Sequence, residues 1–134
     1  MIRVVVDANV YISALVFGGA PQDVLDLIRM RRLHLYISRS IMDEVAGVLL
    51  RKFDWTAREV EYALPPLWGG CIVVKPAVRL HISPDPDDDH VLECVEAVHA
   101  DFLVTGNTRH FPARHNDTKV VNVRQFLQHL ETIS

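Results

Sequence analysis

The fold is decided by one short stretch, Ile2-Arg3-Val4-Val5-Val6-Asp7-Ala8-Asn9. It is apolar, rich in β-branched residues and too short for a typical helix, which predicts a strand buried on both faces of a parallel sheet. Asp7 ends this strand, and ligands of such sheets collect at the carboxyl ends of the strands. The alternative is that Asp7 or Asn9 only caps a helix that begins near Val10, as Asp and Asn often do.

The composition predicts a single domain over residues 1–134. Of the 134 residues, 49% are hydrophobic, which is enough to supply a sizeable core. The 14 Lys and Arg residues against 17 Asp and Glu residues give a net charge of −3. The protein as a whole therefore lacks the basic field that dominates sequence-independent binding of nucleic acid, and a polyanion would be met by a local patch or through metal ions.

The two cysteines, Cys71 and Cys94, form no Cys-x-x-Cys pair. A disulfide framework and a structural zinc site are therefore not expected, and a reducing cytoplasm is the predicted location. The N-terminus lacks the pattern of a signal sequence, and no apolar run approaches the roughly 20 residues that span a bilayer. We expect a cytoplasmic protein without a membrane partner.

Strand and helix patterns alternate along the rest of the chain. Further strands are predicted at residues 33–37, 71–74, 102–105 and 120–123. Helices are predicted at residues 10–17, 21–32, 56–64 and 125–130, with two more that start at Ser38-Arg39-Ser40 and at the acidic run 85–89. Ser40 and Asp43 have the spacing of a capping box, and the helix at 56–64 is expected to end before Pro65-Pro66. Residues 75–84 are predicted to be a loop or crossover.

Glu44 has an unusual position on the helix that starts near Ser40. At about 100° per residue, the apolar residues 41, 45, 48 and 49 form one buried stripe, and Asp43 lies on the opposite side. Glu44 lies beside the stripe, where a carboxylate is costly unless a cation or a donor meets it. A partly solvated residue at the edge of the core is the alternative interpretation.

The acidic run Asp85-Pro86-Asp87-Asp88-Asp89 leads directly into an amphipathic helix. Helix N-termini favour acidic side chains, so a structural role alone would explain one of them. A helical projection places Asp88 and Asp87 on the side of the apolar stripe and directs Asp89 well away from it. Adjacent carboxylates raise one another's pKa unless a cation holds them ionised, so we favour Asp88, and then Asp87, as the acid of a divalent-ion site.

The strand at 102–105 ends in Gly106-Asn107, a polar terminus like that of the first strand. Asn107 offers a carbonyl ligand or simply forms the turn. The oxygen donors Asp7, Glu44, Asp87 or Asp88, and Asn107 suit Mg²⁺ or Mn²⁺ rather than zinc. The histidines are scattered, and His110 and His115 are predicted to be surface residues.

The ordered combination of these motifs resembles the PIN-domain ribonuclease family over nearly the whole chain. The residues that carry the resemblance are Asp7, Asn9 and Ser13 in VVVDANVYISAL, Glu44 in SRSIMDEV, residues 85–92 in DPDDDHVL, and DFLVTGN ending at Asn107. The pattern is most similar to the bacterial and archaeal branch of toxin components of toxin-antitoxin pairs, the VapC-like toxins.

The resemblance implies a three-layer α/β/α fold around a mostly parallel sheet. It also implies a metal-dependent endoribonuclease that hydrolyses single-stranded RNA, that often forms a homodimer and that is inhibited by an antitoxin. Asp7, Glu44 and Asp88 match the three principal acids of the family. Asn107 stands where this branch often has a fourth Asp, so a second metal site should be weakened.

Asn9 and Thr105 match positions that support the first acid and bound water in the family. The resemblance thus implies one or two Mg²⁺ or Mn²⁺ ions that activate water and stabilise charge on the phosphate. Phosphatases and receiver domains also place an Asp at a strand end, but Asp7-Ala8-Asn9 lacks their second Asp. A further alternative is a catalytically weakened RNA- or protein-binding module of the same fold, with Asn107 as the sign of lost activity.

Overall fold

The computed structural model describes residues 2–133, in which helices and strands alternate. The strands are β1 (Arg3–Val6), β2 (His34–Ser38), β3 (Ile72–Val74), β4 (Phe102–Val104), β5 (Arg114–His115) and β6 (Thr118–Val121). The helices are α1 (Ala8–Phe17), α2 (Ala20–Arg29), α3 (Arg39–Lys52), α4 (Ala57–Trp68), α5 (Pro86–Val98) and α6 (Val123–Ile133), with a single 3-10 turn η1 (Thr108–His110).

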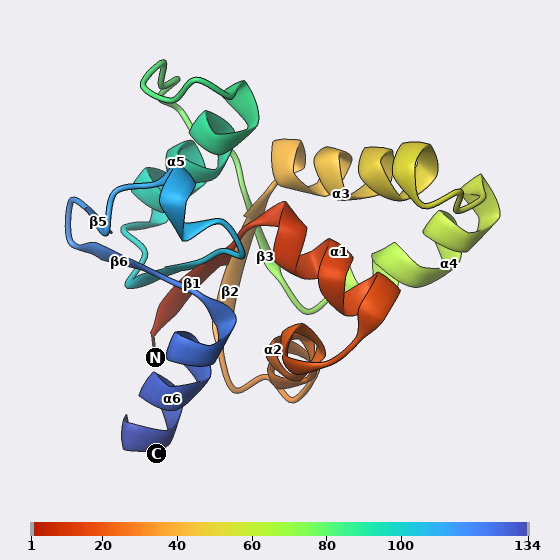
Figure 1. Ribbon diagram of the computed structural model, residues 1–134, viewed down its shortest axis with the longest axis horizontal. Helices are drawn as coiled ribbons and strands as arrows, with labels where there is room; N and C mark the ends of the chain where they lie inside the picture. The colour runs from red at the N-terminus through yellow and green to blue at the C-terminus, as the bar shows by residue number, and fades with distance from the viewer. Residues whose placement is uncertain (1, 134) are drawn as a thin grey trace.

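The six strands form one sheet in the order β3-β2-β1-β4-β6-β5 (Figure 1). Every neighbouring pair is parallel except β5 with β6. From β1 the chain proceeds outward to β2 and β3, and it then returns to place β4 on the other side of β1. The strand order therefore reverses between β1 and β4, and α/β sheets of this kind collect ligands at such a switch point.

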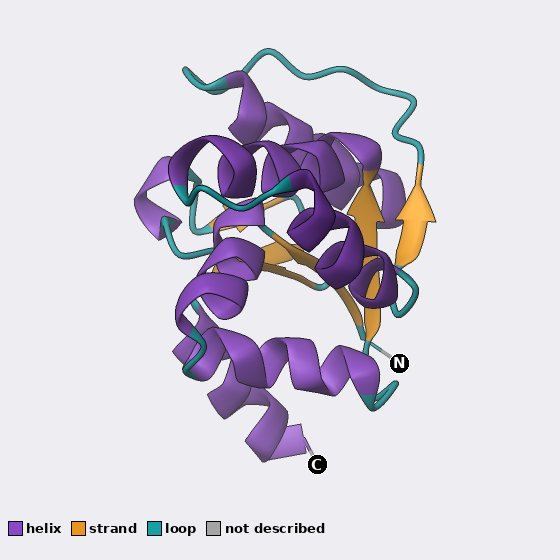
Figure 2. Ribbon diagram, turned by 90° about the vertical axis from the view of Figure 1, so that its right-hand side faces the viewer, coloured by secondary structure: helices purple, strands orange, loops and turns teal. Residues whose placement is uncertain are grey.

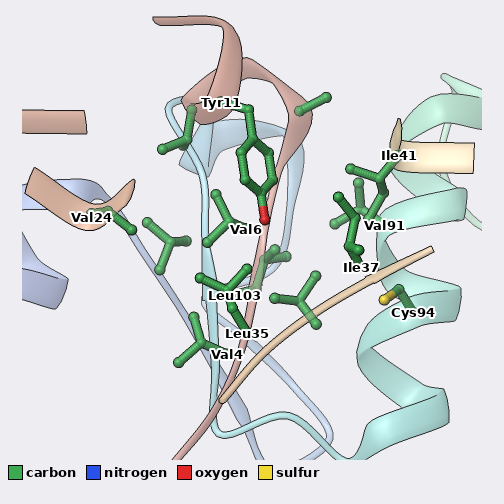
Figure 3. Packing of buried hydrophobic residues seen from close by; sticks show 14 of the residues in the cluster. Val4, Val6, Tyr11, Val24, Leu35, Ile37, Ile41, Val91, Cys94 and Leu103 are labelled. Atoms are coloured by element: carbon green, nitrogen blue, oxygen red, sulfur yellow. The ribbon is translucent and has the colours of Figure 1, made fainter. Parts of the chain in front are cut away.

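Helices cover both faces of the sheet (Figure 2). Helix α5 packs against β1, β2 and β3, whereas α6 packs against β4 and is contacted by α2. Figure 3 shows Val24 of α2 on one side of the central strands and Val91 and Cys94 of α5 on the other. Residues 4–6 are completely buried, which explains the continuous valine run. The predicted α/β fold, with helices flanking a mostly parallel sheet, is confirmed.

The predicted capping box of Ser40 and Asp43 and the predicted end of the helix at 56–64 are wrong. The side chain of Ser38, not that of Ser40, caps α3 by accepting a hydrogen bond from the backbone N–H of Ile41 at 3.4 Å. Helix α4 does not stop before Pro65 but continues through both prolines to Trp68. A proline inside a helix costs about 3 kcal/mol, and here the last turn also buries Leu67 and packs the ring of Trp68 edge-on against another aromatic ring.

The hairpin β5–β6 is absent from the sequence-based prediction, which placed one strand at 120–123 instead of 118–121. Its turn contains Asn116 at φ +52°, a backbone conformation that Asn tolerates better than most residues. The hairpin brings His115 to Glu96, with 2.9 Å between ring Nε2 and the carboxylate, so His115 is not the surface residue that we expected. Over residues 2–133, no helix has the length and apolar character to cross a membrane.

Candidate functional site

Asp7 lies at the switch point, directly after β1. It occupies the N-cap position of α1, but its side chain makes no capping hydrogen bond. Instead the carboxylate Oδ2 accepts a hydrogen bond from the Thr105 hydroxyl at 2.8 Å, and only 6% of the residue is exposed. Burial raises the pKa of Asp7; the Thr105 hydrogen bond opposes the rise, and the charge of Asp88 adds to it. The geometry therefore does not support a simple helix-capping role for Asp7.

The loop after β4 is tied to the start of α1 around this carboxylate. Thr105 is completely buried, and its hydroxyl oxygen accepts a hydrogen bond from the backbone N–H of Asn107 at 3.0 Å. The Asn9 side chain accepts a hydrogen bond from the backbone N–H of Gly106 at 3.1 Å. Asn9 and Thr105 therefore position the strand ends, whereas Asn107 is exposed and joins this network through its backbone.

Glu44 reaches the same edge of the sheet from the second turn of α3. It is partly buried, and burial is the main cause that raises its pKa from 4.5 to about 7. The charges of Asp87, Asp7, Asp85 and Asp88, in decreasing order, add to the rise. Carboxylates from the first strand end and from the acidic run therefore lie close enough to Glu44 to raise its pKa.

The acidic run forms the N-terminus of α5. Asp85 is the N-cap residue, and its side chain accepts a hydrogen bond from the backbone N–H of Asp87 at 2.9 Å. The side chain of Asp88 is 15% exposed, compared with 54% for that of Asp87. Burial, and then the charge of Asp85, raises the pKa of Asp88. Asp88 is thus the more enclosed of the two acids, while Asp87 lies nearer the rim and still acts on Glu44.

Asp89 departs from the expectation that it would point away from the protein interior. Only 5% of it is exposed, and its Oδ1 accepts hydrogen bonds from the backbone N–H groups of Ser83 at 2.9 Å and Ile82 at 3.2 Å. Burial acts to raise the pKa of Asp89, but these hydrogen bonds outweigh it and lower the pKa. The prediction failed because a helical projection considers α5 alone. In the structure the loop 79–84 folds back over this side of α5 and covers Asp89.

His110 lies beside the candidate site, next to Asp88. Its ring Nδ1 lies 3.4 Å from Oδ2 of Asp88, and the His110 side chain is 53% exposed. It is the last residue of η1, three positions after Asn107. His110 is on the surface, as predicted, but no spacing in the sequence shows that this surface adjoins Asp88.

The donor chemistry of this edge fits a hard divalent cation. All of the converging ligand candidates offer oxygen, and enclosed carboxylates with raised pKa values are stabilised in their charged form by a cation. Among residues 2–133, no three Asp, Glu, His or Cys side chains are already gathered closely enough to hold one ion. The carboxylates therefore converge on one edge without forming a tight cluster.

Comparisons with known proteins agree with this architecture. A family model described as "PIN domain" matches residues 3–109, which include every candidate ligand. The chain is 29% identical over 111 residues to uncharacterized protein MJ1680 of Methanocaldococcus jannaschii, covering 79% of this chain and 71% of that protein.

Two solved structures share the fold. One is a chain of VapBC2 from Rickettsia felis, crystallised with a DNA fragment from its promoter; the TM-score is 0.66 at 16% identity, covering 90% of this chain and 98% of that chain. The other is the RRP44 PIN domain of T. brucei, with a TM-score of 0.56 at 14% identity, covering 99% of this chain and 83% of that chain.

Proposed function

This chain belongs to the PIN-domain family, and from that membership we propose that it is a divalent-metal-dependent endoribonuclease that hydrolyses phosphodiester bonds of single-stranded RNA. One observation carries the proposal. Asp7 after β1, Glu44 on α3 and Asp88 on α5 meet at the carboxyl edge of the sheet, where the charges of Asp7 and Asp88 raise the pKa of Glu44 and the charge of Asp88 raises the pKa of Asp7. Mutually repelling, partly desolvated carboxylates are unfavourable for stability and are expected where a cation is to be bound.

In this proposal Asp7, Glu44 and Asp88 hold Mg²⁺ or Mn²⁺, and Asn107 contributes a neutral oxygen. When bound, the ion supplies Lewis acidity that lowers the pKa of a water molecule and neutralises charge on the phosphate. The chain's own residues set the geometry: Thr105 orients the Asp7 carboxylate through its hydroxyl.

Two further residues support that arrangement. Asn9 fastens the loop that carries Asn107, and Asp87 adds negative charge at the rim. Because Asn107 lacks a formal charge, we expect weak affinity for a second ion.

The direct test is cleavage of a labelled single-stranded RNA with Mg²⁺ or Mn²⁺ and with a chelator. Wild type should cleave only with the metal, and Asp7→Asn should lose at least about 100-fold in rate, as expected when a metal ligand is removed. Asp23→Asn, an exposed acid on α2, is the matched control and should retain activity. Equal cleavage by wild type and Asp7→Asn would mean a contaminating nuclease, and purified wild type that shows no metal-dependent cleavage would refute the proposal.

We further propose that the protein is the toxin of a toxin-antitoxin pair, with an antitoxin protein as its inhibitor and a homodimer as its assembly. The fold shared with a VapBC2 chain supports this interpretation. Induced expression of wild type should arrest growth of a bacterial host, while Asp7→Asn should not. Normal growth with full-length wild-type protein would contradict the toxin role, and a monomer in analytical ultracentrifugation would contradict the homodimer.

The second candidate function is a catalytically weakened module of the same fold that binds RNA or protein. Asn107 and the lack of a tightly gathered set of carboxylates among residues 2–133 favour it. Titration with Mn²⁺ separates the two functions. A functional site should show thermal stabilisation by Mn²⁺ that disappears in Glu44→Gln and Asp88→Asn, whereas a decayed site should show none in wild type.

A further inference from the structure

A cleft of about 500 Å³ lies beside the acidic edge. Its walls are the first residues of α3, the segment that follows β3, and one side of α5. His90 of α5 lines the cleft, and its ring Nδ1 is 3.9 Å from the carboxylate of Asp87. Asp87 in turn is the strongest charge acting on Glu44. The cleft is therefore adjacent to the proposed metal site.

The walls of this cleft concentrate positive charge. Arg39, which also forms an exposed ion pair with Asp43 at 3.3 Å, comes from α3, and Lys75 and Arg79 come from the crossover segment 75–84. The carboxylate that lines the cleft belongs to Glu93, whose Oε2 already accepts a hydrogen bond from the backbone N–H of Leu80 at 2.8 Å. Because the whole chain has a net charge of −3, this cleft provides the kind of local cationic surface that binding of a polyanion requires.

The N-terminus of α3 also lines this cleft. Ser38, Arg39 and Ser40 line it, and α3 continues for 14 residues. The Ser38 side chain already accepts from the backbone N–H of Ile41, but the other first N–H groups of the helix have no partner within it, and the helix dipole favours an anion there. The guanidinium groups of Arg39 and Arg79, which also line the cleft, match a phosphate through paired N–H donors.

The wall that carries Arg79 is held in place before any ligand binds. Two carboxylates one turn apart on α5, Asp89 and Glu93, accept hydrogen bonds from the backbone N–H groups of Leu80, Ile82 and Ser83. These bonds fix the segment directly after Arg79 against the helix. A preorganised wall loses less conformational entropy on binding than a free loop does.

We propose that this cleft binds the phosphate backbone of single-stranded RNA next to the bond that is cleaved, with Arg39, Lys75 and Arg79 as the phosphate-binding residues. The inference rests on the proposed nuclease function, because it places the substrate strand relative to Asp7, Glu44 and Asp88. It also explains how an acidic protein binds RNA beside a cluster of carboxylates: the cations on the cleft walls offset the repulsion between those carboxylates and the strand.

The test measures binding separately from cleavage. In an Asp7→Asn background, fluorescence anisotropy of a labelled single-stranded RNA is measured over a range of salt concentrations for Arg39→Gln, Lys75→Gln and Arg79→Gln. Each substitution should weaken binding by about 3- to 10-fold and reduce the slope of log affinity against log salt by about 0.7. In the active protein the same substitutions should raise KM and leave kcat nearly unchanged.

Arg29→Gln is the matched control. Arg29 also forms an exposed helical ion pair, 3.8 Å from Asp26, comparable to that of Arg39 with Asp43 at 3.3 Å. It lies at the end of α2, which precedes β2 and so lies toward the amino edge of the sheet. Binding by Arg29→Gln should equal that of the Asp7→Asn parent.

Unchanged affinity and salt slope in all three cleft variants would overturn the inference. So would equally tight, cleft-dependent binding of a polyglutamate peptide, because it would indicate an acidic protein partner instead of RNA. If wild type shows no metal-dependent cleavage but the cleft variants lose RNA binding, the cleft assignment stands and the nuclease proposal fails. If cleavage is metal-dependent and KM is unchanged in the variants, the nuclease proposal stands and the cleft assignment fails.

Discussion

Replacing Glu44 with glutamine should stabilise the protein above neutral pH and leave its stability nearly unchanged in mild acid. Burial and neighbouring carboxylates raise the pKa of Glu44 from 4.5 to about 7 in the folded protein. A carboxyl whose pKa is raised on folding favours the folded state while it is protonated. That contribution is complete below pH 4.5, declines between pH 4.5 and about 7, and is lost above about pH 7. Glutamine has nearly the same side-chain shape as glutamate but carries no charge at any of these pH values.

The size of the effect follows from the same pKa values. A rise from 4.5 to about 7 corresponds to an upper limit of about 3.4 kcal/mol at about 1.36 kcal/mol for each tenfold change in proton affinity. Because Glu44 is only about half buried, solvent screening reduces this to about 1–2 kcal/mol. In a domain of this size that free energy raises Tm by roughly 3–6 °C.

The assay is thermal unfolding at about pH 8 and about pH 4.5 with a chelator present, on either side of the range in which Glu44 ionises. Glu61→Gln, an exposed residue of α4, is the control and should show no pH-dependent gain. Adding Mn²⁺ should raise the Tm of wild type more than that of Glu44→Gln, so the difference in Tm between the two proteins should become smaller. An equal gain at both pH values, or a loss of stability at the higher pH, would refute the electrostatic reasoning.

Three other predictions concern the frame around the site. Thr105→Val removes the hydroxyl that donates to Asp7 and should cost about 1–3 kcal/mol in urea unfolding, whereas Thr105→Ser should retain most of that stability; equal stability of the two variants would contradict the role of this hydrogen bond. Asp89→Ala should speed hydrogen exchange of the Ser83 amide by about tenfold, and unchanged exchange would show that Asp89 does not hold the loop. Burial raises the pKa of the Cys94 thiol to about 12, so this thiol should react with an alkylating reagent only after unfolding; rapid labelling of the native protein would contradict its burial.

The sequence is most informative where local pattern and tertiary contact agree. The valine run of β1 predicts a strand buried on both faces, and residues 4–6 are indeed completely buried between helices. The helical projection of α3 distinguishes Glu44 from its neighbour Asp43, and the structure places Asp43 on the exposed side in an ion pair with Arg39. Both predictions rest on one periodic element packed against one apolar surface.

The remaining features depend on contacts between distant segments, which periodicity does not record. His110 meets Asp88 only because η1 follows β4 at the switch point. Asp89 is covered by a loop that no helical projection includes. Helix α4 continues through Pro65 because tertiary packing outweighs a local preference to stop. The sequence therefore identifies candidate acids, while the surroundings of each acid follow from the assembled fold.

The hydrogen bond between Asp7 and Thr105 joins residues 98 positions apart, which directly follow two strands, β1 and β4, that are neighbours in the sheet but not in the chain. During translation Asp7 leaves the ribosome long before Thr105 has been synthesised, and pairing of such distant segments is slow compared with local folding. The first carboxylate is therefore held in its final orientation only after most of the polypeptide has emerged. A nascent or truncated chain that ends before β4 would have Asp7, Glu44 and the acidic run 85–89 without the contact that fixes Asp7.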